Sequence, residues 1–350
     1  MTTSPLSPAA AIRQQIDVLA TAIVTRQYAR QAQVWQPYGA PGQSKSVRDA
    51  RYHLEYLAEA LDADAPELFT TYLAWVKVLF AGLGFSDTVL PITLECTRQV
   101  LHERLPADAS RAAVALVDSG QRSLAQAPVE TASLLSGDRA LDHLARSYLQ
   151  ALLAGDRHTA TRLIMQAVEE GASIPDLYLQ VFQRSQREIG RLWHNNQINV
   201  AQEHYCTAAT QLIISLLYPR IFTPTPKSHS LVLTCVGGEL HELGARMVAD
   251  LLELAGWDTH FLGANTPTAS VLSILAERQA ALLGISATMT FHVPLVRELV
   301  QETRRSGLDV RILVGGYPFN LAPQLWRSVG ADGYAADAQE AVAVAARLIA

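Results

Sequence analysis

The chain has 350 residues, of which 49% are hydrophobic and 17% charged, so it is long enough for two or three domains and too apolar for a disordered protein. Its net charge of −5 argues against a protein that binds DNA through a broad basic face, and no direct DNA binding is expected. No run of 18 uninterrupted apolar residues occurs, so the sequence predicts no membrane span.

The first predicted domain, residues 1–128, is helical. Apolar residues recur at spacings of three and four in "RDARYHLEYLAEALDA" and "PELFTTYLAWVKVLFAGL", which is the pattern of amphipathic helices. The segment "SDTVLPITLECTRQVLHERL" predicts a third helix. Ten of the 24 aromatic residues of the chain lie in this domain, and it has no basic recognition helix.

The second predicted domain, residues 129–226, is a four-helix bundle. Four apolar-periodic segments are separated by short polar turns: "DRALDHLARSYLQALLAGD", "RHTATRLIMQAVEEG", "SIPDLYLQVFQRSQREIGRLWHNNQ" and "INVAQEHYCTAATQLIISLLYPRIF". The segment "FTPTPKSHS" then interrupts the helical pattern, so we interpret it as a linker.

The third predicted domain, residues 227–350, alternates strands with helices. Short apolar runs predict five strands: "SLVLTCV", "DTHFLG", "ALLGISAT", "DVRILVGG" and "GYAA". Each is followed by a helical segment, which favours a flavodoxin-like (Rossmann-like) five-stranded parallel sheet covered on both faces. The predicted fold class is therefore multidomain, α in the first two domains and α/β in the third.

Three loops of the third domain follow strands and so lie at the edge of the sheet where such folds bind ligands. Small residues and hydroxyls in these loops leave room for a large ligand, and His241 in the first loop can ligate a transition metal. No GxGxxG sequence follows the first strand, so a dinucleotide site is not indicated. The candidate residues are Gly238, Glu239, Leu240, His241, Gly244, Ser286, Thr288, Gly315 and Gly316.

These loops resemble the cobalamin-binding domain of methionine synthase and the corrinoid-dependent mutases. That family carries DxHxxG, SxT or SxL, and GG after strands one, three and four, and this chain has "ELHELG", "SAT" and Gly315-Gly316. The resemblance implies that His241 is the lower axial ligand of cobalt and that the other loops hold the nucleotide tail of the cofactor. Glu239 departs from the family by replacing Asp. The alternative is a loop histidine in an unrelated flavodoxin-like domain.

The bundle is similar to that of CarH-type cobalamin photoreceptors. The stretch "WHNNQINVAQEH" has their W-x9-EH pattern, which implies that Trp193, Glu203 and His204 cover the upper face of the corrin. His194 has the place of a residue that can ligate cobalt after light breaks the Co–C bond. The alternatives are a tryptophan of the bundle core and a solvated histidine at a helix end.

The helical N-terminal domain resembles, without a short diagnostic motif, the corresponding segment of photocobilin-type proteins, which combine cobalamin with a bilin. This resemblance implies that Tyr52, His53, Trp75 and Lys77 contact a bilin such as biliverdin. The alternative is that these aromatic residues are ordinary core and the charged residues ordinary helix surface.

The function predicted from these resemblances is a non-enzymatic photoreceptor that binds adenosylcobalamin and changes conformation when light cleaves the Co–C bond. Its signal is expected to leave through homo-oligomerisation or a partner protein. The alternative is a corrinoid methyl-shuttle protein that works with a partner methyltransferase. A third hypothesis is a cobalamin-responsive regulator in which light has no part.

The cysteines and the N-terminus bear on the cellular location. Cys96, Cys206 and Cys235 are widely spaced and form no CxxC, so neither a disulfide framework nor a zinc site is indicated. The first residues lack a basic region followed by an apolar one, so no secretory signal is predicted. A reduced, cytoplasmic setting is expected.

Overall fold

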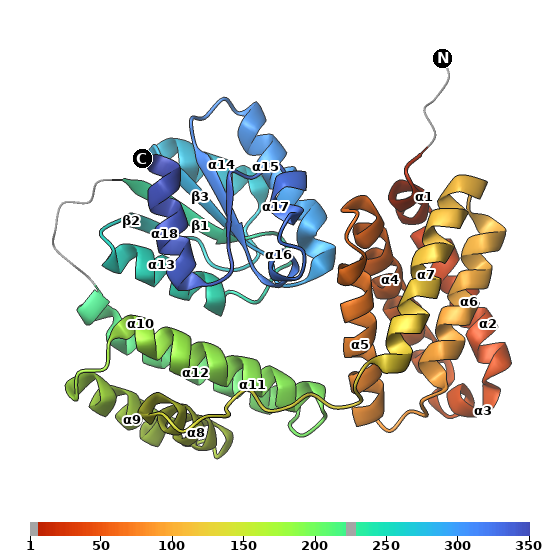
Figure 1. Cartoon of the computed structure of the whole chain (residues 1–350), viewed down its shortest axis with the longest axis horizontal. Helices are drawn as coiled ribbons and strands as arrows, with labels where there is room; N and C mark the ends of the chain where they lie inside the picture. The colour runs from red at the N-terminus through yellow and green to blue at the C-terminus, as the bar shows by residue number, and fades with distance from the viewer. Residues whose placement is uncertain (1–5, 222–228) are drawn as a thin grey trace. The chain divides into compact units, whose positions relative to one another are not determined.

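The computed structural model describes residues 6–221 and 229–350, and Figure 1 shows the chain coloured from the N-terminus to the C-terminus. The chain divides into two compact units, residues 1–130 and residues 131–350. Residues 222–228, which make up most of the predicted linker, lie outside the described residues.

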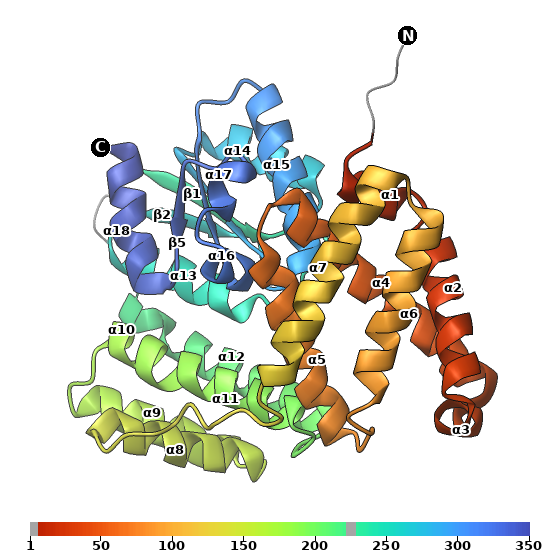
Figure 2. The same cartoon turned by 45° about the vertical axis from the view of Figure 1, so that its right-hand side comes forward.

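The first unit is a bundle of helices, seen in Figure 2 with α6 and α7 in front. The three helices predicted here are present, and the structure adds helices at residues 8–38 and 107–126 that the apolar pattern did not reveal. Their bounds are α1 (Pro8–Gln14), α2 (Ile16–Arg30), α3 (Ala32–Trp35), the 3₁₀ turn η1 (Gln36–Tyr38), α4 (Gly39–Asp62), α5 (Pro66–Gly82), α6 (Val89–Arg104) and α7 (Ala107–Gln126).

The second unit begins with the predicted four-helix bundle. Its first, second and fourth helices are α8 (Ala140–Leu153), α9 (Arg157–Glu169) and α12 (Val200–Ile221). The third runs through α10 (Ile174–Asp176), the π-helical turn η2 (Leu177–Phe182) and α11 (Gln183–His194). The wider turn occurs where Tyr178 is fully buried and its hydroxyl donates to Asp250 of the sheet domain, 2.8 Å away. Hydrophobic spacing does not distinguish such a turn from an α-helix.

The sheet has five parallel strands in the order β2-β1-β3-β4-β5. The strands are β1 (Ser230–Cys235), β2 (Asp258–Phe261), β3 (Leu282–Ser286), β4 (Arg311–Gly315) and β5 (Gly333–Ala335). The intervening helices are α13 (Leu243–Leu254), α14 (Thr268–Arg278), the 3₁₀ turn η3 (Thr290–His292), α15 (Val293–Arg305), α16 (Tyr317–Leu321), α17 (Leu325–Ser328) and α18 (Ala338–Ile349).

Helices cover both faces of this sheet, as Figure 1 shows for α13 and α18 on one face and α14 and α15 on the other. Apolar residues of β1, β4 and β5 pack against α13 and α18 in one buried cluster. The predicted fold class is thereby confirmed. The order reverses between β1 and β3, so the crevice for a ligand is expected between the loops that follow these two strands.

Bundle and sheet domain share a core within the second unit. Leu243, Met247 and Leu251 of α13 belong to the same apolar cluster as the interior of the bundle. Hydrogen bonds add to it: the amide nitrogen Nε2 of Gln211 on α12 donates to Oε1 of Glu242, 3.0 Å away. Because α13 starts two residues after His241, the bundle packs on the helix that follows the candidate ligand.

Within the described part of the chain, no helix is long and apolar enough to cross a membrane.

Candidate functional site

His241 lies in the loop between β1 and α13, at the carboxyl edge of the sheet. Its side chain is 61% exposed, and its Nδ1 lies 2.6 Å from Oε1 of Glu239. Because the carboxylate occupies Nδ1, the nitrogen that is left to bind a metal is Nε2.

Glu239 is fully buried and connects this loop to the one after β3. Its Oε1 accepts hydrogen bonds from Nδ1 of His241 and from the backbone N–H of the same residue, at 2.6 and 3.0 Å. Its Oε2 accepts from the backbone N–H groups of Thr288 and Met289 at 2.7 and 3.1 Å. Nδ1 of His292 lies 3.0 Å from the same oxygen. The carboxylate therefore bridges the two loops that flank the expected crevice.

These contacts fix the charge and the tautomer of the pair. Burial by itself would raise the pKa of Glu239, but the hydrogen bonds from His241, His292 and the backbone outweigh it and bring the pKa far below its usual range. The hydrogen bond to Glu239 raises the pKa of His241, against the effect of burial. An ionised carboxylate accepts a hydrogen bond from Nδ1–H, so the neutral imidazole keeps its proton on Nδ1 and its lone pair on Nε2.

The loops after β3 and β4 approach each other so closely that only glycine fits. Gly316 has φ +107°, and a Cβ on it would clash with the carbonyl oxygen of Ala287. A Cβ on Gly315 would come within 3.1 Å of the carbonyl oxygen of Ala335. Ser286 and Gly315 are partners in neighbouring strands. This edge of the sheet therefore consists of backbone and small side chains, which suits a groove for an extended ligand.

Three further predicted residues flank His241 in sequence. Gly238 has φ +78°, and its N–H donates to Oδ1 of Asn265, 2.7 Å away, which ties the loop to the one after β2. A Cβ on Gly244 would meet nothing within 4 Å. Leu240 is 72% exposed and places apolar surface next to the exposed imidazole.

The residues of the W-x9-EH pattern lie at the end of α11 and the start of α12. Trp193 is 36% exposed, whereas His194 beside it is buried. Oε1 of Glu203 accepts from the Thr207 hydroxyl at 2.9 Å, and its Oε2 lies 3.4 Å from Nε2 of His204. After the hydrogen bond and charge of Glu239, the negative charge of Glu203 also raises the pKa of His241, so the first turn of α12 lies within electrostatic range of that imidazole.

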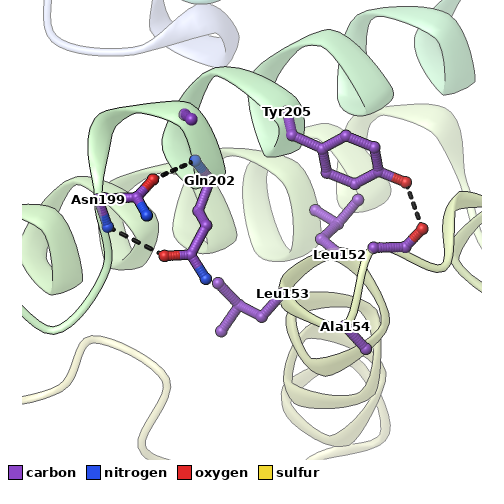
Figure 3. A pocket seen from close by; sticks show the side chains of 8 residues that line it. Leu152, Leu153, Ala154, Asn199, Gln202 and Tyr205 are labelled. Carbon is purple, nitrogen blue, oxygen red and sulfur yellow. Dashed lines mark hydrogen bonds between the residues drawn. The ribbon is translucent and has the colours of Figure 1, made fainter.

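A pocket of about 340 Å³ lies between the first turn of α12 and the end of α8 (Figure 3). Asn199 and Gln202 exchange backbone-to-side-chain hydrogen bonds of 3.0 Å, and the Tyr205 hydroxyl donates to the Gly155 carbonyl. These polar contacts anchor the start of α12 and hence the helix turn that carries Glu203. The pocket is lined by Leu152, Leu153, Ala154, Gly155, Asn199, Ala201, Gln202 and Tyr205.

The residues proposed to contact a bilin have structural partners in the first unit. The Lys77 ammonium donates to the carbonyls of Leu124 and Ala127, which caps the end of α7. His53 is buried with its Nδ1 2.7 Å from the Tyr72 hydroxyl, and burial lowers its pKa to about 4. Tyr52 and Trp75 are 40% and 39% exposed.

Sequence reasoning missed two side chains at the site. His292 bonds the Glu239 oxygen that does not contact the His241 ring. Glu242 accepts hydrogen bonds from Gln211 through Oε1 and from the Ala264 N–H through Oε2, the latter at 2.9 Å. The sequence signal for His292 was its position six residues after Ser286, on the ligand-binding edge. Glu242 belongs to "ELHELG" itself and is the residue that directly precedes α13.

The donor set fits a corrinoid. Among residues 6–221 and 229–350, no group of three or more His, Cys, Asp or Glu side chains is arranged to hold a metal ion. A single imidazole with an available Nε2 instead suits a metal that arrives in a macrocycle and takes an axial ligand from the protein. The exposed Leu240 and the glycine-walled edge supply apolar surface and space for such a ring and its tail.

Comparison with known proteins agrees with this chemistry. Residues 229–343 and residues 144–218 each match a family described as a B12 binding domain. Dimethylamine corrinoid protein 1 of Methanosarcina acetivorans is 36% identical over 118 residues, which are 33% of this chain and 54% of that protein. Dimethylamine corrinoid protein 3 of Methanosarcina mazei is 35% identical over 118 residues, 33% of this chain and 69% of that protein.

A solved structure, the Methanosarcina barkeri monomethylamine corrinoid protein, aligns with a TM-score of 0.53 at 22% identity. The alignment covers 60% of this chain and 100% of the solved one, which supports the fold. The chain spans between 54% and 59% of the length of the first three curated relatives it matches.

These relatives contradict the predicted photoreceptor. The relatives that match the site-bearing part of the chain include several dimethylamine corrinoid proteins, and a light-sensing role with a bilin chromophore is wrong on this comparison. The bilin contacts assigned to Tyr52, His53, Trp75 and Lys77 are withdrawn with it, as is ligation by His194 after photolysis. The chain has a cobalamin-binding domain, and it belongs to the family of B12-binding corrinoid proteins.

Proposed function

We propose that this protein is a methyl carrier, which holds a corrinoid and exchanges methyl groups with a separate methyltransferase. The observation that carries the proposal is the arrangement of Glu239 and His241 beneath an exposed edge of the sheet, in a chain whose relatives are dimethylamine corrinoid proteins. A carrier needs no catalytic side chains of its own, which agrees with a site made of one ligand, its carboxylate and small residues. The upper ligand is then methyl in place of the adenosyl group expected from the sequence.

When bound, the corrinoid supplies a cobalt atom to which a methyl group can be attached and from which it can be removed. Nε2 of His241 would bind that cobalt, and Glu239 would hold the imidazole ring in place and keep the lone pair on Nε2. The edge formed by Ser286, Gly315 and Gly316 would receive the nucleotide tail. Leu240 would pack against the corrin ring.

The bundle would cover the upper side of the site. Trp193, Glu203 and His204 would shield the upper ligand from water, and methyl exchange would require them to move aside for the partner enzyme. A division into domains 1–128, 129–226 and 227–350, with a reduced cytoplasmic setting for the three free cysteines, forms part of the same proposal.

Transfer of a labelled methyl group tests the carrier role. The protein is loaded with cobalamin, reduced to Co(I), and mixed with isotopically labelled methylamines and each methyltransferase of the same organism. Labelled methyl should appear on the bound corrinoid with one of them. If none transfers methyl to protein that binds the corrinoid through His241, the carrier role is refuted while corrinoid binding stands.

The axial ligand is tested separately by the Co(II) form. Electron paramagnetic resonance should show the splitting caused by one axial imidazole nitrogen, and His241→Ala should abolish it. A splitting that survives in His241→Ala would show that another nitrogen ligates the cobalt.

A further inference from the structure

A chain of polar side chains inside the bundle ties the start of α12 to α11. Nε2 of Gln186 on α11 donates to Oγ1 of Thr210 at 2.8 Å, and its Oε1 lies 3.0 Å from the Thr207 hydroxyl. The same hydroxyl lies 2.9 Å from Oε1 of Glu203. Gln186 on one helix is therefore linked to the Glu203 carboxylate on the other through a single hydroxyl group, that of Thr207.

The buried end of this chain fixes the orientation of the Gln186 amide. Tyr148 and Thr210 are fully buried, and their side-chain oxygens lie 2.8 Å apart. Burial raises the pKa of Tyr148, so its hydroxyl keeps the proton that it donates. The Thr210 hydroxyl donates to the Cys206 carbonyl, so the Thr210 oxygen accepts from Tyr148 and from Nε2 of Gln186. An amide whose nitrogen is bound there presents its oxygen to Thr207.

The Thr207 hydroxyl is the stronger of the two side-chain contacts of Glu203. The other carboxylate oxygen lies 3.4 Å from Nε2 of His204, whose side chain is 74% exposed, and an ion pair in water contributes little. Gly190 lies one turn after Gln186 on the same face of α11 and offers no side chain to hold the carboxylate; a Cβ there would meet nothing within 4 Å. The orientation of the carboxylate therefore depends on Thr207.

The same contacts determine which faces of α11 and α12 meet. Gln186 and Trp193 are seven residues apart, so they lie on one face of α11, two turns or about 10 Å apart along its axis. Glu203, Thr207 and Thr210 follow one face of α12 at spacings of four and three. α12 runs back along α11, with Gln186 opposite Thr207 and Thr210. Trp193 is therefore level with the first turn of α12, where Glu203 lies.

We infer that Thr207, held by Gln186, is a positioning residue for the upper side of the site: it holds the Glu203 carboxylate on the face of α12 that meets α11. Trp193 lies at the same level, so the indole and the carboxylate shield the upper ligand together. A hydrogen bond to a carboxylate is roughly twice as strong as one between neutral groups, which makes a single hydroxyl sufficient for this task. The inference deepens the proposed function, on which it rests for the shielding role of the bundle.

Three variants separate this role from packing and from stability. Thr207→Val keeps the shape of the side chain and loses the hydroxyl, whereas Thr207→Ser keeps the hydroxyl and loses a methyl group. If Thr207 only fills space, the valine variant should resemble the wild type more closely than the serine variant does. If it positions Glu203, the order is reversed. Tyr148→Phe removes a buried hydroxyl from the same network without touching Thr207 or Glu203.

The measurement is the rate at which cyanide replaces the upper water ligand of bound aquacobalamin, followed by absorption in the full chain with one equivalent of cyanide. Thr207→Val should raise this rate about 10-fold or more, as expected when one hydrogen bond to a charged group is lost. Thr207→Ser should stay close to the wild type. Tyr148→Phe should lower the urea midpoint of unfolding and leave the exchange rate unchanged. The axial nitrogen splitting of the Co(II) form should be the same in all three, because His241 lies on the other side of the cobalt.

A double-mutant cycle shows whether Thr207 acts through Glu203. In a Glu203→Ala background, Thr207→Val should no longer change the rate of cyanide exchange. A wild-type rate in Thr207→Val, a faster rate in Thr207→Ser than in Thr207→Val, or an additive effect in the double variant would each overturn the inference. Because no methyltransferase is present, failure of methyl transfer with these rates as expected would count against the proposed function alone.

Discussion

Replacing Glu239 by Gln is the sharpest test of the site, because the substitution keeps the shape of the side chain and removes its charge. The carboxylate accepts from His241 through one oxygen, and from Thr288, Met289 and His292 through the other. A glutamine offers one oxygen and one NH₂ group. Whichever way the amide turns, its NH₂ faces groups that are themselves donors.

The size of the effect follows from the donors left without an acceptor. At least one backbone N–H group loses its acceptor, and a buried unpaired donor costs about 1–3 kcal/mol, so the free energy of unfolding should fall by about 1–3 kcal/mol. If the NH₂ faces His241, the imidazole accepts at Nδ1 and its proton moves to Nε2, which removes the lone pair from the face that binds cobalt. Cobalamin affinity should then fall about 10- to 100-fold.

Urea unfolding followed by tryptophan fluorescence measures the first effect, and spectrophotometric titration with cobalamin measures the second. Glu242→Gln is the matched control. That carboxylate lies in the same loop and accepts from Gln211 and Ala264, but it does not contact the His241 ring. We expect the control to bind cobalamin nearly as well as the wild type. A Glu239→Gln protein with unchanged stability and unchanged affinity would refute the reasoning about the buried carboxylate.

Three further predictions concern the groove, the bundle and the first unit. Gly316→Ala should destabilise the chain by about 2 kcal/mol or more in urea unfolding and weaken cobalamin binding in titration, because its φ of +107° and the adjacent carbonyl exclude a Cβ. Gly244→Ala, whose Cβ meets no protein atom within 4 Å, should unfold at the same urea concentration as the wild type. Tyr178→Phe removes the hydroxyl that donates to the buried Asp250 and should cost about 1–3 kcal/mol in urea unfolding; an unchanged midpoint would show that Asp250 finds another partner. Burial lowers the pKa of His53 to about 4, so the folded chain holds it neutral while the unfolded chain takes up a proton below its pKa of 6.5; stability should therefore fall by about 3 kcal/mol as the pH drops from 6.5 to 4, and urea unfolding at several pH values should show a smaller fall for His53→Asn.

The photoreceptor prediction failed because the residues on which it rested indicate that the chain binds cobalamin and do not indicate what the bound cobalamin does. Trp193, Glu203 and His204 lie at the end of α11 and the start of α12, and their pattern does not distinguish a methyl from an adenosyl upper ligand. Lys77 and His53 looked available for a chromophore in the sequence, whereas the fold engages them in a helix cap and a buried tyrosine contact. Spacing along a helix does not reveal which polar side chains already have hydrogen-bond partners within the fold.

The sequence by itself determined the fold class and the edge on which the site lies. Alternation of apolar runs with helical periods specifies a doubly wound sheet, and loops that follow parallel strands must converge at one edge. His241, Gly315 and Gly316 could be selected on that ground alone. The tertiary structure decided what Glu239 does. Its partners Thr288, Met289 and His292 lie 49 to 53 residues further along the chain, and the meeting depends on the pairing of β1 with β3, which local sequence does not encode. The structure settles the contact that the sequence left open, because one Glu239 oxygen bonds Nδ1 of His241 and the other bonds the loop after β3.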